Sequence, residues 1–111
     1  MVDGHRIERK IEVTNFLDLM KNYNYSNIEC SKHTVFRLSE KQSKSFKCSN
    51  LIELLLTKEP KLVGIQYNGL HAVFYKNQNN NYIKILLDIS LKKIEIVTYY
   101  TIDLSQLPVI K

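Results

Sequence analysis

His33 and Arg37 lie four residues apart in the segment 30–42, which reads Cys-Ser-Lys-His-Thr-Val-Phe-Arg-Leu-Ser-Glu-Lys-Gln. If this segment is helical, the imidazole and the guanidinium stack about one turn apart on one face, and Lys41 and Lys44 continue the row. A titratable base beside fixed positive charge suits a phosphodiester. The same row on a plain surface helix would be a solvated basic face, so both interpretations stay open from these residues alone.

Other side chains that suit a phosphate lie in the β-rich second half of the chain. The hydroxyls of Thr98 and Tyr100 would orient a phosphate, and Lys84 would add positive charge. His71 would serve as a second acid or base if its face of the sheet is open, and is a core or rim histidine if that face is covered. Threonine and tyrosine are also common in strands because they pack well there, which is the plainer explanation for Thr98 and Tyr100.

The composition is typical of a single globular domain with an anionic partner. The chain has 111 residues, of which 44% are hydrophobic and 24% are charged, and its formal net charge is +5. A positive balance of this size favours a polyanion such as RNA. No apolar run approaches the roughly 18 residues of a membrane span, and the first ten residues lack the apolar stretch of a secretory signal. We therefore expect a cytoplasmic protein with no membrane partner.

The pattern of cysteines and acidic residues predicts neither a metal nor a cofactor. Cys30 and Cys48 form no CxxC pair and have no partnered set of histidines, so we expect two reduced, buried or half-buried thiols. A glycine-rich phosphate loop, paired metal carboxylates and a Ser, His, Asp arrangement are not recognisable. Nucleotide triphosphate hydrolysis and metal-dependent nuclease chemistry are therefore not expected.

Helices are predicted in the first half of the chain. Residues 7–13 alternate loosely, as in a short strand or an extended arm, and Thr14 then offers an N-cap for a short amphipathic helix. A second helix is predicted over residues 32–44, although its pattern also fits a strand. Asn50, with Glu53 three residues later, resembles a capping box for a strongly apolar third helix that ends before Pro60.

Four strands are predicted in the second half. They cover residues 62–67, 70–76, 82–89 and 94–102. Asn68-Gly69 between the first two is typical of a two-residue hairpin turn. Strict alternation along the last strand would place Thr98 and Tyr100 on the same face as Ile94 and Ile96. We therefore predict an α+β fold with two or three N-terminal helices packed on one face of a four-stranded antiparallel sheet, whose other face is left available.

The order of these motifs resembles a known superfamily. The motifs are His33-x-x-x-Arg37, an apolar helix, the hairpin Val-Gly-Ile-Gln-Tyr-Asn-Gly-Leu-His-Ala-Val-Phe-Tyr, the strand Ile-Lys-Ile-Leu-Leu and the last strand Ile-Val-Thr-Tyr-Tyr. Together they resemble the RelE-like superfamily of small ribonucleases, the group of barnase, EndoU, colicin and RelE. The nearest likeness within it is a toxin-like domain family with a Ser-Lys-His-x-x-x-Arg start and a Val-Thr-x-Tyr last strand. The likeness covers residues 28–102 of a single domain, 1–111, with 1–27 as an N-terminal strand and helix extension.

The resemblance implies a metal-independent endoribonuclease of toxin type that cleaves RNA by attack of the 2′-OH. Such cleavage needs a base, an acid and cations that stabilise the charged transition state. The catalytic residues would be His33, Arg37, Thr98 and Tyr100. The RNA-binding residues would be Lys41, Lys44, Lys84 and His71. A separate antitoxin protein would be a second partner. The family often continues after its arginine with a second arginine and a glycine, whereas Leu38-Ser39-Glu40-Lys41 follows here.

A second hypothesis keeps the RelE-like fold without the enzyme. A catalytically inactive module would use the same basic, aromatic-bearing sheet to bind nucleic acid or a protein partner. An enzyme needs His33, Arg37 and a hydroxyl of the sheet within reach of one phosphate, whereas a binding module needs only a basic surface.

Overall fold

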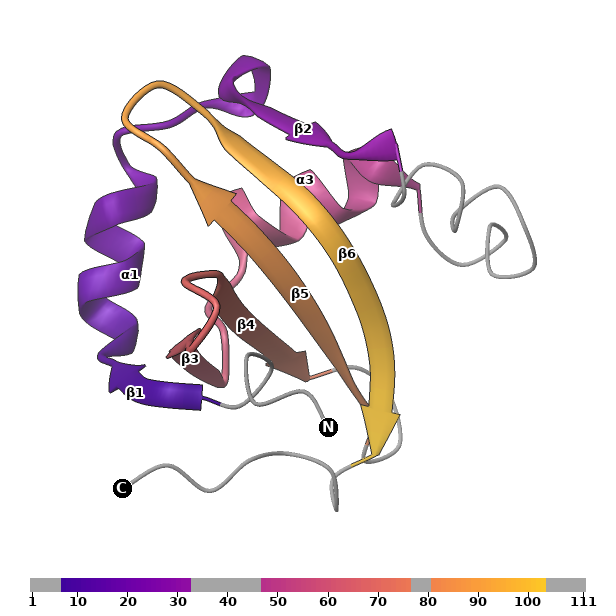
Figure 1. Ribbon diagram of the computed structural model, residues 1–111. Coiled ribbons are helices and arrows are strands. Elements are labelled where there is room, and N and C mark those ends of the chain that lie inside the picture. The colour runs from indigo at the N-terminus through magenta and orange to yellow at the C-terminus, as the bar shows by residue number, and fades with distance from the viewer. Residues whose placement is uncertain (1–6, 33–46, 77–80, 104–111) are drawn as a thin grey trace.

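A computed structural model describes residues 7–32, 47–76 and 81–103 of the chain (Figure 1). The elements in chain order are β1 (Ile7–Ile11), α1 (Val13–Met20), the 3₁₀ turn η2 (Tyr25–Asn27), β2 (Ile28–Cys30), α3 (Cys48–Thr57), β3 (Leu62–Gln66), β4 (His71–Lys76), β5 (Asn81–Ile89) and β6 (Ile94–Asp103). The described strands form one six-stranded sheet in the order β1-β3-β4-β5-β6-β2. The helix predicted over residues 32–44 lies almost entirely outside the described residues.

The predicted four-stranded sheet with N-terminal helices is wrong, although the α+β mixture is present. Strands β3 to β6 do form an antiparallel meander. However, β1 adds to one edge of the sheet, antiparallel to β3, and β2 adds to the other edge, parallel to β6. The helices α1 and α3 alternate with strands instead of preceding them. Local alternation reveals a hairpin, but it does not reveal that a three-residue segment such as β2 pairs with a strand far along the chain.

The hairpin between β3 and β4 turns at Asn68-Gly69 as predicted, but Gln66 pairs with Leu70, so its loop has three residues instead of the predicted two. Gly69 adopts a φ of 89°, which a residue with a side chain rarely tolerates. The amide of Gly69 donates to the carbonyl of Gln66 at 2.9 Å, and the amide of Gln66 donates to the carbonyl of Leu70 at 2.9 Å. The Asn68-Gly69 dipeptide thus fixes the register in which β3 and β4 pair.

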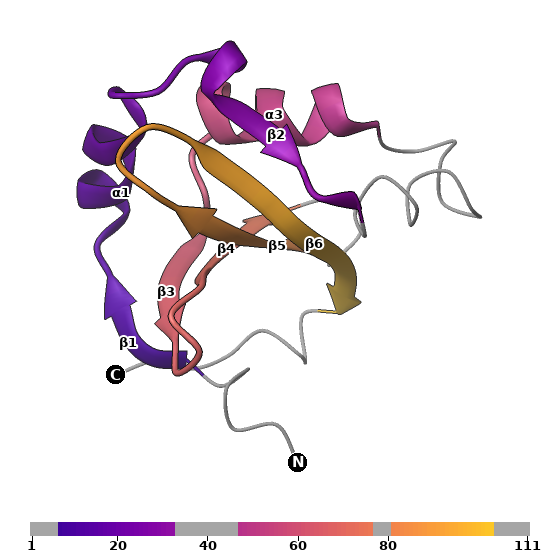
Figure 2. The ribbon, with the colours of Figure 1, turned by 45° about the horizontal axis from the view of Figure 1, so that its top comes forward.

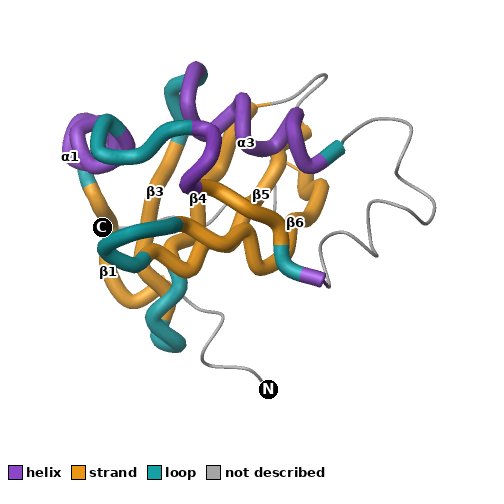
Figure 3. Tube along the Cα trace, turned by 90° about the horizontal axis from the view of Figure 1, so that it is seen from above, coloured by secondary structure: helices purple, strands orange, loops and turns teal. Residues whose placement is uncertain are grey.

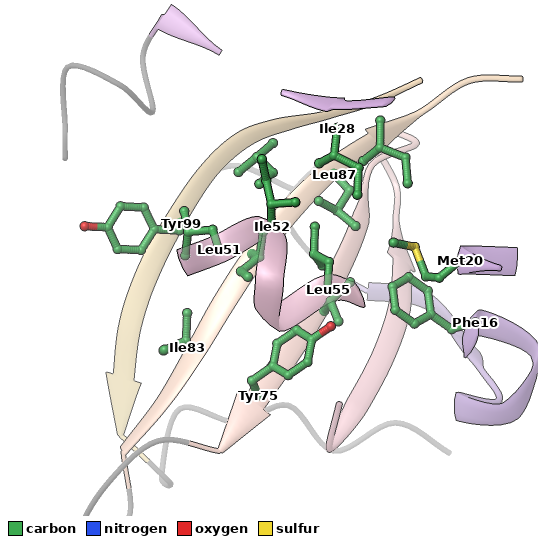
Figure 4. Packing of buried hydrophobic residues seen from close by; sticks show 14 of the residues in the cluster. Phe16, Met20, Ile28, Leu51, Ile52, Leu55, Tyr75, Ile83, Leu87 and Tyr99 are labelled. Carbon is green, nitrogen blue, oxygen red and sulfur yellow. The ribbon is translucent and has the colours of Figure 1, made fainter. Parts of the chain in front are cut away.

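Both helices cover the same face of the sheet and enclose the main core (Figure 3). From α1, Phe16 and Met20 are buried four residues apart, as one face of a helix requires. From α3, Leu51, Ile52 and Leu55 are buried. Figure 4 shows these helix side chains packed over inward-facing residues of the strands. Those labelled on the sheet are Ile28, Tyr75, Ile83, Leu87 and Tyr99.

Each helix begins earlier than its predicted cap. The N-cap of α1 is Glu12, not Thr14. The N-cap of α3 is Lys47, and Asn50 is the third helical residue. The side-chain oxygen of Asn50 accepts a hydrogen bond from the amide of Lys47 at 2.8 Å. The capping chemistry at Asn50 is therefore present, but the asparagine reaches back from inside the helix instead of preceding it.

A β-bulge reverses the predicted faces of the last strand. Leu87 pairs with Ile96, but the preceding residue, Leu86, pairs with Thr98, so β6 has one extra residue at this point. Beyond the bulge, side chains that alternation alone would place with Ile96 turn to the other face. Thr98 and Tyr100 therefore lie on the face without helices, whereas the prediction placed them on the same face as Ile94 and Ile96.

The face of the sheet that the helices leave uncovered is partly filled by apolar side chains, so less of it is open to a ligand than predicted. Ala72, Phe74 and Leu86 are buried there and form a second, smaller apolar cluster. The partly buried residues packed against them are Ile7, Leu62, Leu70, Val97, Tyr100 and Ile102. Three of them come from β6 and the others from β1, β3 and the turn after β3, and Figure 2 shows a strongly curved sheet. Neither helix in the described part of the chain is long and apolar enough to cross a lipid bilayer.

Candidate functional site

The structure describes half of the predicted site residues. His33, Arg37, Lys41 and Lys44 lie outside the described residues. The others belong to the described strands: His71 to β4, Lys84 to β5, and Thr98 and Tyr100 to β6. Three of these four share one face of the sheet, and His71 lies on the other.

Lys84, Thr98 and Tyr100 form a group that we call the Lys84 cluster. Lys84 pairs directly with Tyr100 across β5 and β6, and Thr98 faces Leu86 two pairs further along. Directly paired side chains have Cβ atoms roughly 5 Å apart, and diagonal neighbours lie within reach of a long side chain. The bulge in β6 is what brings Thr98 and Tyr100 to the face of Lys84.

The ammonium of Lys84 is partly withdrawn from water. Its Nζ lies 5.7 Å from the ring centroid of Phe74. Phe74 belongs to β4 and is the partner of Lys84 on the strand that flanks β5 on the side away from β6. Phe74 is itself only 1% exposed, so the lysine stem covers apolar surface. Desolvation lowers the pKa of Lys84. The ion pairs among the described residues are Lys21 with Asp18 and Lys93 with Glu29, so Lys84 has no carboxylate partner in this part of the chain.

The hydroxyl of Thr98 is on the same face of the sheet as the ammonium of Lys84. The residue is 5% exposed, and its Oγ1 has no hydrogen-bond partner within the described residues. A buried hydroxyl without a partner costs about 1–3 kcal/mol, and a ligand would recover that energy only after the Thr98 side chain turned outward, because its oxygen is closed off from solvent. A half-buried cation and two hydroxyls on an apolar floor suit an anion with several acceptor oxygens.

His71 is separated from the Lys84 cluster by the sheet. It lies in register with Leu87, whose side chain is in the main core, and it shares its face with Val73 and Tyr75. Burial, and next the positive charge of Arg9, lower the pKa of His71. By this placement His71 is a rim histidine of the helix-covered face, and it cannot meet a phosphate held at Lys84.

This lowered pKa predicts a loss of stability in mild acid. The unfolded chain protonates His71 near the ordinary value of about 6.5, whereas the folded chain takes up that proton only at lower pH. The unfolded state then binds more protons, so the free energy of unfolding falls as the pH drops through about 6.5 toward the folded pKa. Urea unfolding at several pH values between 7.5 and 5 should show this fall. It should be smaller in His71→Gln, and an identical pH profile in the variant would contradict the assignment.

The two cysteines are bonded, contrary to the prediction of reduced thiols. A disulfide joins Cys30 at the end of β2 to Cys48 at the start of α3, with the Cα atoms 6.1 Å apart. Their separation of 18 residues gives no signal by itself, because the pairing depends on where β2 joins the sheet. Within the described residues no group of three or more histidine, cysteine or acidic side chains is placed to hold a metal ion.

Comparison with known proteins adds no relative to this description. The chain matches no protein-family model, no curated protein and no solved structure.

Proposed function

We propose that the chain binds RNA through the Lys84 cluster and cleaves it as a metal-independent endoribonuclease of toxin type. The observation that carries the proposal is the convergence of Lys84, Thr98 and Tyr100 on one face of the sheet. A phosphate there would meet an ammonium that has no carboxylate partner among the described residues. It would also satisfy the buried hydroxyl of Thr98 once that side chain turned outward. The net charge of +5 supports a polyanion over a single small anion.

The catalytic part of the proposal belongs to residues outside the described part of the chain. His33 would transfer the proton of the 2′-OH or of the leaving oxygen, and Arg37 would hold the phosphate with two parallel hydrogen bonds. Lys41 and Lys44 would add charge for the RNA strand. The RelE-like likeness, an antitoxin partner and a cytoplasmic location are parts of this proposal.

The placement of His71 favours a second candidate, a binding module without catalysis. The histidine that the structure describes lies on the face opposite to the Lys84 cluster, so within the described residues the cluster would bind an anion without an imidazole to move a proton. If His33 does not complete the site, RNA or an acidic protein would be held and left intact.

Binding of single-stranded RNA should depend on Lys84 and on salt. If about three phosphates are neutralised, the logarithm of the affinity falls with the logarithm of the salt concentration with a slope of roughly −2. Lys84→Gln should weaken binding and reduce this slope by about 0.7, the share of one phosphate. Fluorescence anisotropy of labelled RNA over a salt series measures both quantities.

Two variants make this test specific. Lys58→Gln removes the same charge at the end of α3, on the helix-covered side, and should leave the slope almost unchanged. Thr98→Val removes only the buried hydroxyl, so it should weaken RNA binding without lowering the free energy of unfolding. Equal affinities of Lys84→Gln and Lys58→Gln, or no binding of RNA at low salt, would remove the Lys84 cluster as the RNA site.

A further inference from the structure

The disulfide joins two elements that lie side by side at one edge of the sheet. Both Figure 1 and Figure 2 show β2 running along α3, and the bond connects the last residue of β2 to the first residue of α3. Cys30 and Cys48 are half-buried against the main core. Neither residue is fully buried, and we expect a small thiol to reach the bond.

The two sulfur atoms have different electrostatic surroundings. Cys48 is the first residue of the ten-residue helix α3, and side chains at this position tilt toward the helix N-terminus. The positive end of the helix dipole stabilises a thiolate there, and Lys47 next to it is exposed and positively charged. Cys30 ends a strand, where the net backbone dipole is small. Of the two sulfurs, Cys48 is therefore the better leaving group.

Hydrogen bonds that do not involve sulfur hold both cysteines in place. Beyond Cys30, the amide of Ser31 donates to the carbonyl of Ile96 at 2.9 Å, and the hydroxyl of Ser31 donates to the carbonyl of Val97 at 2.7 Å. Before Cys48, the amide of Lys47 donates to the side chain of Asn50 at 2.8 Å. Breaking the S–S bond leaves these contacts intact, so the two thiols remain close and the bond can form again.

We propose that the Cys30–Cys48 disulfide is a reversible redox site in which an incoming thiolate attacks Sγ of Cys30 and Cys48 leaves as the thiolate. The new bond is a mixed disulfide between the incoming sulfur and Cys30. A second thiol of the reductant, either the other thiol of a dithiol or a second small thiol, then attacks the incoming sulfur and releases Cys30. The reductant loses two electrons and becomes a disulfide, and both cysteines end as thiols after protonation. This inference does not depend on RNA binding.

The experiment maps which cysteine accepts the incoming thiol. The oxidised full-length chain is incubated with reduced glutathione, aliquots are quenched in acid, and the freed thiol is capped with N-ethylmaleimide before peptide mass spectrometry. Glutathione should be found on Cys30 with an excess of about threefold over Cys48, the size of effect expected from a helix terminus. The same reaction in urea should give nearly equal labelling, because the unfolded chain has no helix.

Three results would overturn the proposal. One is a native chain that carries glutathione mainly on Cys48, or equally on both cysteines. Another is an excess on Cys30 that persists unchanged in urea, since the fold would then not be its cause. The third is a native disulfide that glutathione does not open while the chain remains folded.

Discussion

The oxidised chain is expected to be about 3 kcal/mol more stable toward unfolding than the variant with both Cys30→Ser and Cys48→Ser. The disulfide closes a loop across a separation of 18 residues, and a loop of this length costs the unfolded chain conformational entropy worth about 3 kcal/mol. Serine is small and keeps the backbone hydrogen bonds at both ends, so the loss of the cross-link dominates the change. Urea unfolding followed by circular dichroism measures the difference.

Reductant provides the matched control for this prediction. A reducing agent should lower the urea midpoint of the natural chain toward that of the double serine variant, and it should have no effect on the variant itself. Equal midpoints of oxidised and reduced protein would show that the bond between β2 and α3 contributes nothing to stability, whatever its chemistry.

The antiparallel meander was predictable because its signals are local. Alternation over 82–89 and the Asn68-Gly69 turn both act within a few residues, and β3 to β6 pair as they indicate. The outer strands were not predictable in this way. The partner of β1 is β3 and the partner of β2 is β6, and both pairings depend on how the whole chain folds.

The candidate site was predicted in its residues but not in its geometry. The sequence predicts Lys84 and Tyr100 as polar residues suited to a phosphate, yet strict alternation places Tyr100 with the core residues Ile94 and Ile96. The extra residue in β6 that corrects this has no mark in the sequence, because valine, threonine and tyrosine are all ordinary strand residues. The disulfide was missed for a related reason, since β2 brings Cys30 to Cys48 only through its parallel pairing with β6.

In the proposed enzyme, the position of His71 leaves the role of acid or base to a histidine outside the described residues. A metal-independent ribonuclease needs at least one group that moves protons at neutral pH, and imidazole is the side chain best suited to this. His71 is on the helix-covered face of the sheet, away from Lys84. The likeness to the His-x-x-x-Arg motif assigns this role to His33 in the proposed enzyme, whereas a binding module does not need it.

His33→Ala is accordingly expected to slow RNA cleavage by about 10²- to 10⁴-fold, the usual contribution of a positioned acid or base, while RNA binding remains almost unchanged. Arg37→Ala should weaken both binding and cleavage, because in the proposed site its charge would contact the phosphate in the ground state as well. A 2′-deoxy linkage at the cleavage site should resist cleavage, since the internal nucleophile is missing, and a chelator should have no effect.

His71→Gln is the matched control and should cleave at nearly the natural rate. Gel assays on structured and unstructured RNA measure these rates. Cleavage by His33→Ala at the natural rate would exclude His33 as the acid or base. If the natural chain leaves every RNA intact, the binding module becomes the function.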